Sequence, residues 1–278
     1  MSKIESRKAL DITRHMVAPG EKVRLDECDP NDTSGYSGGR TDAEEEVKML
    51  KVRLEALHEK LYASHSHKLL IVLQGMDTAG KDSTIKMVFE GVNPQWVRVV
   101  GFKAPSSQEL DHDFLWRVHM QVPVKGEIVI FNRSHYEDVL AVRVHKLVPK
   151  EIWESRYEEI NDFERMLTEE GTSILKFYLN ISEDEQKRRL EDRLKDPTKE
   201  WKFSINDLPE RGFWPEYMKA YEAVFEKTST KWAPWYIVPG NHRWIRDLIV
   251  STVIVNTLEN LNLSFPRLDP KLRSLSVE

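Results

Sequence analysis

The chain has 278 residues, of which 40% are hydrophobic and 31% charged, with a net charge of −5 at pH 7. This composition is ordinary for a globular protein, and the acidic total gives no signal for a nucleic-acid partner. A single cysteine, Cys28, excludes an intrachain disulfide framework. No apolar run approaches the roughly 18 residues of a transmembrane helix, so we expect no membrane partner. Residues 1–10 lack the apolar core of a signal peptide, which favours a cytoplasmic protein.

The first predicted elements lead to a glycine-rich loop. Residues 1–40 contain several aspartates, prolines and glycines, which indicates a long extended arm. A helix is predicted to start near Thr41, because Thr41 and Glu44 have the spacing of a capping box and leucines recur at helical spacing. The apolar run at 69–73 is typical of a strand buried on both faces of a parallel sheet. After the loop, residues 82–90 are predicted to form a helix.

The alternation of strands and helices continues along the chain. Further strands are predicted at 98–102, 127–131, 174–181 and 235–238. Helices are predicted at 108–121, from Pro149 to about 169, from a capping box of Ser182 and Glu185 to about 195, and at 244–261. Together these elements predict an α/β fold, a three-layer parallel sheet of five strands that binds ligands at the carboxyl ends of its strands.

The polar stretch 196–212 lies between two helices and interrupts this pattern, so we interpret it as a mobile cover. The expected organisation is an arm at 1–40, a domain at 41–265 with a lid at about 183–212, and a tail at 266–278.

Residues 75–83 (GMDTAGKDS) have the G-x-x-x-x-G-K spacing of a Walker A phosphate loop. Glycines let backbone N–H groups face an anion, and the next helix adds its positive N-terminal end. The lysine then reaches the terminal phosphates. An ordinary strand-to-helix turn is the alternative. The phosphate-binding residues predicted in this loop are Gly75, Ala79, Gly80, Lys81, Asp82 and Ser83.

Two carboxylates distinguish this loop from an ordinary Walker A motif. Asp82 stands where a Ser or Thr hydroxyl normally ligates magnesium. Asp77 lies inside the loop, where a carboxylate repels phosphate unless a cation lies between them. We therefore expect Asp77 to ligate Mg²⁺, for which Mn²⁺ is the substitute. The alternative for Asp77 is an Asx turn that caps the loop.

A second polar run, NRSHYED, follows the strand predicted at 127–131. A Walker B motif places a metal-supporting aspartate at this strand end, but the residue here is Asn132. Arg133 is expected to grip phosphate oxygens, and Glu137 to assist the metal ligand Asp77. Asn132, Glu137 and Asp138 are the candidate nucleotide-binding residues. The alternative is a structural ion pair between Arg133 and Glu137 or Asp138.

Cations of the charged helix and of the cover segment complete the predicted site. Most of them are expected to form a solvated face, but some should close over bound phosphates. The preferred candidates are Arg193 and Lys202, followed by Arg189. The predicted catalytic residues are Asp77, Lys81 and Arg133.

These runs together resemble polyphosphate kinase family 2, in particular its class III members, which use polyphosphate to phosphorylate both AMP and ADP. The resemblance spans about residues 20–265 and rests on four stretches: the phosphate loop, FNRSHYEDV at 131–139, DPTKEWKF at 196–203 and APWYIVP at 233–239. Asn132 and Glu137 resemble class III, whereas other classes tend to carry Asp at the strand end. Ser83 departs from the glycine of many relatives.

The resemblance implies a P-loop kinase fold with a helical lid, magnesium as cofactor and a homo-oligomer, either a dimer or a tetramer. It also implies reversible phosphoryl transfer from inorganic polyphosphate to AMP or ADP, with ADP and ATP as products. One alternative is an ATP-dependent nucleoside monophosphate kinase resembling thymidylate kinase, which Asp82 and Asn132 disfavour. The other is a non-catalytic binder of polyanions or nucleotides, against which Asp77, Lys81 and Arg133 argue together.

Overall fold

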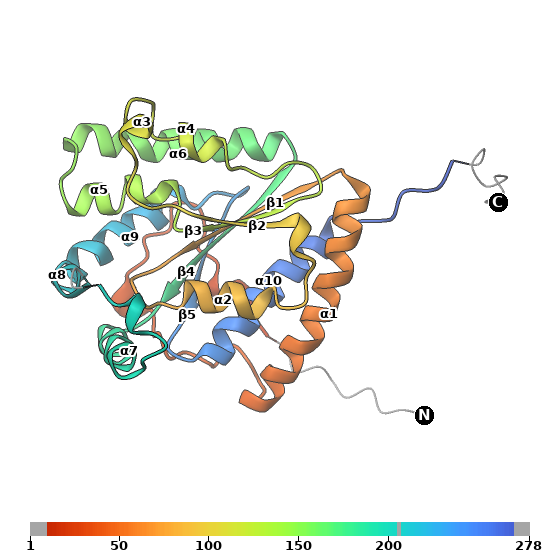
Figure 1. Cartoon of the computed structure of the whole chain (residues 1–278), viewed down its shortest axis with the longest axis horizontal. Helices are drawn as coiled ribbons and strands as arrows, with labels where there is room; N and C mark the ends of the chain where they lie inside the picture. The colour runs from red at the N-terminus through yellow and green to blue at the C-terminus, as the bar shows by residue number, and fades with distance from the viewer. Residues whose placement is uncertain (1–9, 205–206, 270–278) are drawn as a thin grey trace.

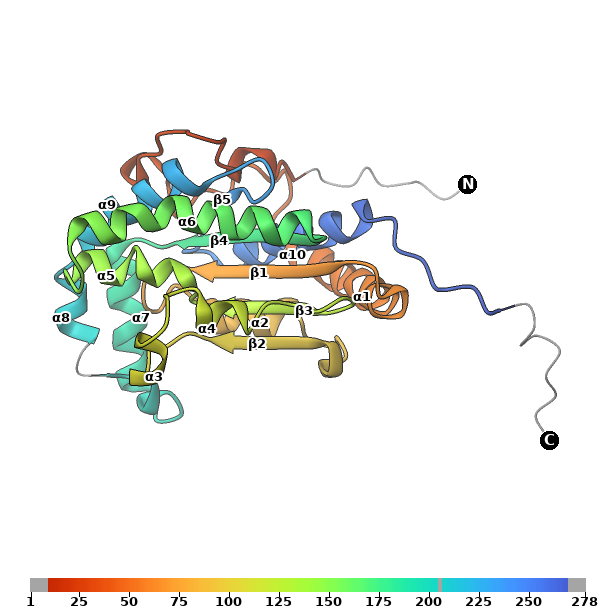
Figure 2. The same ribbon diagram turned by 90° about the horizontal axis from the view of Figure 1, so that it is seen from above.

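A computed structural model describes residues 10–204 and 207–269 of the chain. At its centre is a five-stranded sheet in the order β2-β3-β1-β4-β5, in which every neighbouring pair is parallel (Figures 1 and 2). The strands are β1 (Lys68–Gln74), β2 (Val97–Gly101), β3 (Ile128–Asn132), β4 (Thr172–Asn180) and β5 (Trp235–Pro239). The predicted fold class is confirmed, and each predicted strand lies within two residues of an observed one.

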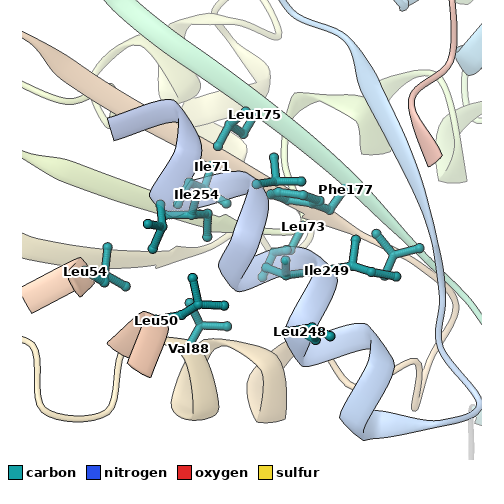
Figure 3. Packing of buried hydrophobic residues seen from close by; sticks show 14 of the residues in the cluster. Leu50, Leu54, Ile71, Leu73, Val88, Leu175, Phe177, Leu248, Ile249 and Ile254 are labelled. Atoms are coloured by element: carbon teal, nitrogen blue, oxygen red, sulfur yellow. The ribbon is translucent and has the colours of Figure 1, made fainter. Parts of the chain in front are cut away.

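One face of the sheet is covered by α1 (Arg40–Ser64), α2 (Lys81–Val88) and α10 (Arg243–Asn260). Alternate residues of each strand point to opposite faces, so β1 contributes Ile71 to this core and Val72 to the core of the other face. This arrangement explains the continuous apolar run in β1. Figure 3 shows the side chains that meet here, with Leu50, Leu54, Val88, Leu248, Ile249 and Ile254 from the helices, and Ile71, Leu73, Leu175 and Phe177 from the strands.

The second face is covered by α6 (Lys150–Glu169) and α9 (Trp214–Thr228), together with shorter helices. These include α4 (Trp116–His119), η4 (His135–Asp138) and α5 (Ala141–Val144). The prediction of one helix over 108–121 is wrong, because this stretch forms α3 (Ser107–Leu110) and α4 as separate pieces. Between them, Asp113 Oδ1 accepts the Leu115 N–H at 3.0 Å, a local bond that competes with helical pairing.

The two predicted capping boxes have different outcomes. At the start of α1, the Gly39 N–H donates to Asp42 Oδ2 at 2.9 Å, so the helix begins at Arg40 and the predicted Thr41 box is wrong. The start of α7 (Glu183–Lys195) is as predicted, since Ser182 Oγ accepts the Glu185 N–H at 3.2 Å. The Glu185 carboxylate does not close that box, however, because it pairs with two arginines of α7.

The described part of the N-terminal arm packs against the sheet. It contains the short helices η1 (Thr13–His15) and η2 (Leu25–Glu27), and Met16 forms an antiparallel bridge with Tyr236 of β5. Further along, Asn180 Nδ2 donates to Cys28 O at 2.9 Å. The arm therefore runs beside β5 and crosses the carboxyl end of β4. Among the described residues, no helix combines the length and the apolar character that crossing a bilayer requires.

A fully buried ion pair lies beneath η4, on the second face of the sheet. Lys176 Nζ of β4 donates to Glu164 Oε2 at 2.6 Å, to Tyr136 Oη at 2.8 Å and to Thr228 O at 2.7 Å, which uses all three of its N–H donors. Burial works to raise the pKa of Glu164, but the charges and hydrogen bonds of Lys176 and His135 together outweigh it and hold this pKa below its ordinary value. His135 Nε2 also lies 3.2 Å from Glu164 Oε1. The pair thus joins α6, α9, β4 and η4.

Removing one partner of this pair should destabilise the fold strongly. In Lys176→Met the Glu164 carboxylate loses its counter-charge inside the core, which should lower the free energy of unfolding by about 3–5 kcal/mol. Urea denaturation measures this change. The double variant Lys176→Met/Glu164→Leu removes both charges and should regain most of the loss. If the single and double variants lose equal stability, packing rather than charge is the cause.

Candidate active site

The phosphate loop follows β1 and turns sharply into α2. Gly75 has φ 149° and Gly80 has φ 105°, values that favour glycine. A Cβ atom at Gly75 would lie 2.9 Å from Leu179 O, and one at Gly80 would lie 2.2 Å from Arg246 Nη1. Both glycines are therefore required by backbone conformation and by space. The predicted phosphate-binding residues of this loop and of the first turn of α2 lie together: Gly75, Ala79, Gly80, Lys81, Asp82 and Ser83.

Lys81 lies in the first turn of α2 and folds back over its own loop. Its Nζ donates to Gly75 O at 2.7 Å and to Met76 O at 3.3 Å, and the residue is only 8% exposed. Burial lowers the pKa of Lys81 to about 8. The nearby Arg133 charge also lowers this pKa, whereas the Asp77 carboxylate raises it. A phosphate at the loop would offer this ammonium a stronger partner than two neutral carbonyl groups.

Arg133 and Asp77 meet across the carboxyl ends of β3 and β1. Arg133 Nη2 donates to Asp77 Oδ1 at 2.6 Å, and the Arg133 N–H donates to Leu73 O at 3.1 Å. Burial opposes the charge of Arg133, but Glu137 and Asp77 outweigh it and hold the Arg133 pKa above its ordinary value. Arg133 also has φ 62°, a left-handed conformation that is rare outside glycine and clusters at functional sites. Two separate sequence runs thus form one charged cluster.

The other polar groups of the site are also engaged. Asn132 Nδ2 donates to Asp82 Oδ1 at 2.6 Å, so these two departures from the ordinary motifs contact each other. When the Gln74 amide nitrogen faces Glu137, it lies 3.1 Å from Oε1 and the amide oxygen accepts from Ser134. Asp82 also lies in the first turn of α2, where a negative charge is favourable.

The carboxylates here suit a metal ion that arrives with phosphate. Among the described residues, no group of three or more His, Cys, Asp or Glu side chains is arranged to hold a metal. Mg²⁺ commonly takes only one or two protein carboxylates and completes its shell with substrate phosphates and water. Asp77 already holds a cationic guanidinium group at 2.6 Å, which shows that its carboxylate accommodates a positive charge. The donor set therefore fits magnesium.

Arg189 contacts the phosphate loop from behind. The sequence predicts it as a phosphate ligand, but its side chain is 6% exposed and its five N–H donors all meet protein acceptors. These acceptors are Glu185 Oε1, Thr78 O, Ala79 O, Gly240 O and Asn241 O. Arg189 thus joins α7, the phosphate loop and the loop after β5, and it positions backbone instead of reaching the ligand.

Asp138 pairs with arginines that lie outside the phosphate loop. Its Oδ1 lies 3.2 Å from Arg156 Nη1, and its Oδ2 lies 4.0 Å from Arg117 Nη2. Burial raises the pKa of Asp138 in spite of these two arginines. Asp138, which was predicted to bind the nucleotide, therefore forms a structural ion pair. Its partner is Arg156 and not Arg133.

The predicted lid cations lie at and beyond the end of α7. Arg193 follows Arg189 by one helical turn and is half-buried on the same face of α7. Lys202 belongs to η5 (Glu200–Lys202), and its side chain lies outside the described residues. The next helix, α8 (Asp207–Arg211), contacts the site through Arg211, whose Nη1 donates to Gln186 Oε1 at 2.6 Å. Gln186 Nε2 in turn donates to Asp77 O at 3.1 Å.

A cavity of about 280 Å³ opens beside Asp77, Arg133 and Glu137. Several residues that line it were not predicted from the sequence, namely Ala141, His145, Gln186, Glu210, Tyr217 and Tyr221. His145 Nε2 lies 3.0 Å from Glu210 Oε1, and Tyr217 Oη donates to Glu210 Oε2 at 3.2 Å. One signal was available, because Tyr217 and Tyr221 have the spacing of one helix face. The cavity combines a charged floor with aromatic walls, which suits a nucleotide.

Comparison with known proteins identifies the family. A family model described as Polyphosphate kinase 2 matches residues 38–266. The chain belongs to the polyphosphate kinase 2 family. It is 52% identical to an AMP/ADP-polyphosphate phosphotransferase of Meiothermus ruber, over 96% of this chain and 100% of that protein. It is 43% identical to an ADP-polyphosphate phosphotransferase of Rhodopseudomonas palustris, over 92% of this chain and 93% of that protein.

A solved structure gives the same assignment. The crystal structure of polyphosphate kinase 2 from Arthrobacter aurescens TC1 is 44% identical and has a TM-score of 0.90, covering 97% of this chain and 95% of that one. The resemblance found in the sequence is therefore confirmed, and this member of the polyphosphate kinase 2 family is an enzyme that transfers phosphoryl groups.

The pKa of Lys81 predicts a pH dependence of polyphosphate binding. Lys81 is charged below about pH 8 and loses its proton as the pH rises through that value. A bound polyanion favours the charged form, so affinity should be full below pH 8 and should fall above it, by at most about tenfold per pH unit. Isothermal titration at constant ionic strength measures the dissociation constant. Lys81→Arg keeps its charge and should show no such slope, and equal slopes in both proteins would assign the effect to another group.

Proposed function

We propose that this polyphosphate kinase transfers the terminal phosphoryl group of inorganic polyphosphate to AMP and to ADP, reversibly, forming ADP and ATP. The Meiothermus ruber relative, whose name includes both acceptors, supports this proposal. The observation that carries it is the cluster of Asp77, Arg133 and Lys81 at one loop, with Asp82 and Asn132 in place of the usual magnesium-binding groups. Family membership disfavours an ATP-dependent nucleoside monophosphate kinase and a non-catalytic binder.

The proposed reaction breaks one P–O–P bond and forms another. An oxygen of the acceptor phosphate attacks the terminal phosphorus of polyphosphate, and the shortened chain leaves as an anion. Neither step needs a strongly tuned general base, because an acceptor phosphate is already ionised at neutral pH. The protein contributes position and charge. Lys81 and the loop N–H groups stabilise the transferred group, and Arg133 contacts donor or acceptor oxygens.

The cofactor that we propose is Mg²⁺, with Mn²⁺ as its substitute, held by Asp77 and Glu137. When bound, the ion would neutralise negative charge on the reacting phosphates. With an ion on the Asp77 carboxylate, Arg133 would have to share that carboxylate or release it. On release, the Arg133 guanidinium group would be available to a phosphate oxygen. The paired state of Asp77 and Arg133 thus keeps both groups compensated until ligands replace the pair.

The lid in this proposal excludes water from the reacting phosphates. Glu210 ties its helix α8 to His145, just after α5, and to α9, and Arg211 ties it to α7. Arg193 and Lys202 are proposed to close over the donor chain, and dry surroundings then favour transfer over hydrolysis. A homo-oligomer and a cytoplasmic location stay predictions from the sequence.

One assay tests the function. Purified protein is mixed with AMP or ADP, magnesium and long-chain polyphosphate, and ADP and ATP are quantified over time. We expect ADP from AMP and ATP from ADP. Transfer only from ATP to a nucleoside monophosphate would reject the proposed donor, and binding without transfer from either donor would indicate a non-catalytic protein.

Matched variants test the assigned roles. Asp77→Asn and Lys81→Ala should each lower kcat by about 10²–10³-fold, since each removes charge stabilisation at the reacting phosphates. Asp192→Asn and Lys86→Ala, at exposed positions of α7 and α2, are the controls and should stay within about twofold of the unmodified protein. Near-normal magnesium-dependent turnover in Asp77→Asn would refute the metal assignment.

A further inference from the structure

A second cavity, of about 630 Å³, lies between α1, α2 and the start of α10, on the face of the sheet shown in Figure 3. We call it the α1–α10 pocket. It shares no lining residue with the cavity beside Asp77 and Arg133. Its volume falls within the roughly 300–1,000 Å³ that is usual for small-molecule sites. The pocket is thus large enough for a ligand of its own.

Part of the α1–α10 pocket is apolar. Val47 of α1, Met87 of α2 and Trp244 of α10 line it. Met87 is 39% exposed, and the half-buried Trp244 is held in place by Tyr36, whose ring centroid lies 6.5 Å from that of the indole. An indole and a thioether make favourable contacts with a flat aromatic ring. This part of the pocket therefore suits a planar base.

The charged residues of the lining leave an excess of positive charge, because each acid is already paired with a cation. Arg40 pairs with Glu44 at 2.7 Å, and Lys51 pairs with Glu90 at 2.6 Å. The third acid of the lining, Asp247, pairs with Arg246 at 2.7 Å, behind the pocket. Every acid of the lining thus has a cationic partner.

Two exposed cations of the lining have no such partner. Lys48 of α1 and Arg243 of α10 form no salt bridge within the part of the chain that the structure describes. His242 lies beside them in the lining. Two unmatched cations next to an aromatic wall favour a ligand that carries both phosphate and a ring system.

We propose that the α1–α10 pocket is a second nucleotide-binding site, separate from the acceptor site. The base lies against Trp244 and Met87, and the phosphates are bound by Lys48 and Arg243. A bare polyphosphate chain would use the cations but would leave the apolar wall without a partner, so the lining favours a nucleotide over the inorganic donor.

The position of this pocket connects it to the phosphate loop. Asp247 Oδ1 accepts from Arg246 Nε at 2.9 Å and from Arg246 Nη2 at 2.7 Å. The remaining nitrogen, Nη1, is buried without a hydrogen-bond partner and lies where a Cβ atom of Gly80 would come within 2.2 Å. The buried Arg246 thus lies between Asp247, which lines the pocket, and Gly80 of the phosphate loop.

Binding stoichiometry tests the proposal. Equilibrium dialysis of the full chain with radiolabelled ADP and magnesium should give about two ADP per chain at saturation. In Lys48→Glu/Arg243→Glu the value should fall to about one, while kcat for AMP phosphorylation stays within about twofold. Both positions are exposed, so reversing their charge leaves the core intact. The control Lys125→Glu/Lys231→Glu makes the same change in net charge at exposed positions outside the pocket and should retain two ADP.

Photolabelling locates the bound base directly. An azido-substituted ADP should label the peptide that contains Trp244 in the unmodified protein and in the control, but not in Lys48→Glu/Arg243→Glu. One ADP per chain in the unmodified protein would overturn the proposal. Two ADP per chain in the Lys48/Arg243 variant, or labelling confined to peptides of the acceptor site, would overturn it as well. None of these outcomes depends on whether polyphosphate is the donor.

Discussion

The site depends on the parallel register of β1 and β3. Leu73 pairs with Asn132 in that register, so Gly75 and Arg133 both leave the sheet at the same edge. A parallel sheet aligns the ends of neighbouring strands, and the polar loops that follow them must therefore share one space. The contacts between Asp77 and Arg133 and between Asp82 and Asn132 follow from this alignment. A shift of one residue in the pairing would turn alternate side chains of a strand to the opposite face and separate these groups.

The charged groups of this site are compensated within the protein. Lys81 donates to loop carbonyls, Asp77 holds Arg133, and Asp82 accepts from Asn132. When a ligand binds, these groups therefore exchange partners within the protein for partners on the ligand. Such an exchange keeps the desolvation penalty of the buried Lys81 charge low in both states. The same principle governs the scaffold below the site, where Glu164 and Lys176 satisfy each other within the core.

Local sequence patterns predicted the sheet and the phosphate loop well, because apolar runs and glycine spacing are local signals. The strand ends could be located because polar residues follow each apolar run directly. Residues whose roles depend on a distant partner were harder to predict. Arg189 and Arg193 are one helical turn apart, and only the position of the loop after β5 shows that Arg189 contacts backbone carbonyls. His145 and Glu210 meet through tertiary packing, and no spacing in the sequence relates them. The break near Asp113 includes a local bond from the Leu115 N–H to the Asp113 side chain, which helical spacing does not predict.

The arm along β5 affects how the chain folds. Ser229 Oγ donates to Val17 O across 212 positions of sequence, and Met16 bridges to Tyr236 in the last strand. Contacts of such long range form late, because closing a long loop costs entropy before any contact compensates for it. During synthesis from the N-terminus, the part of the arm at Met16 and Val17 cannot dock until β5 has emerged. After β5 has joined the sheet and before the arm docks, the outer edge of β5 can pair with other chains, and docking of the arm removes this route to aggregation.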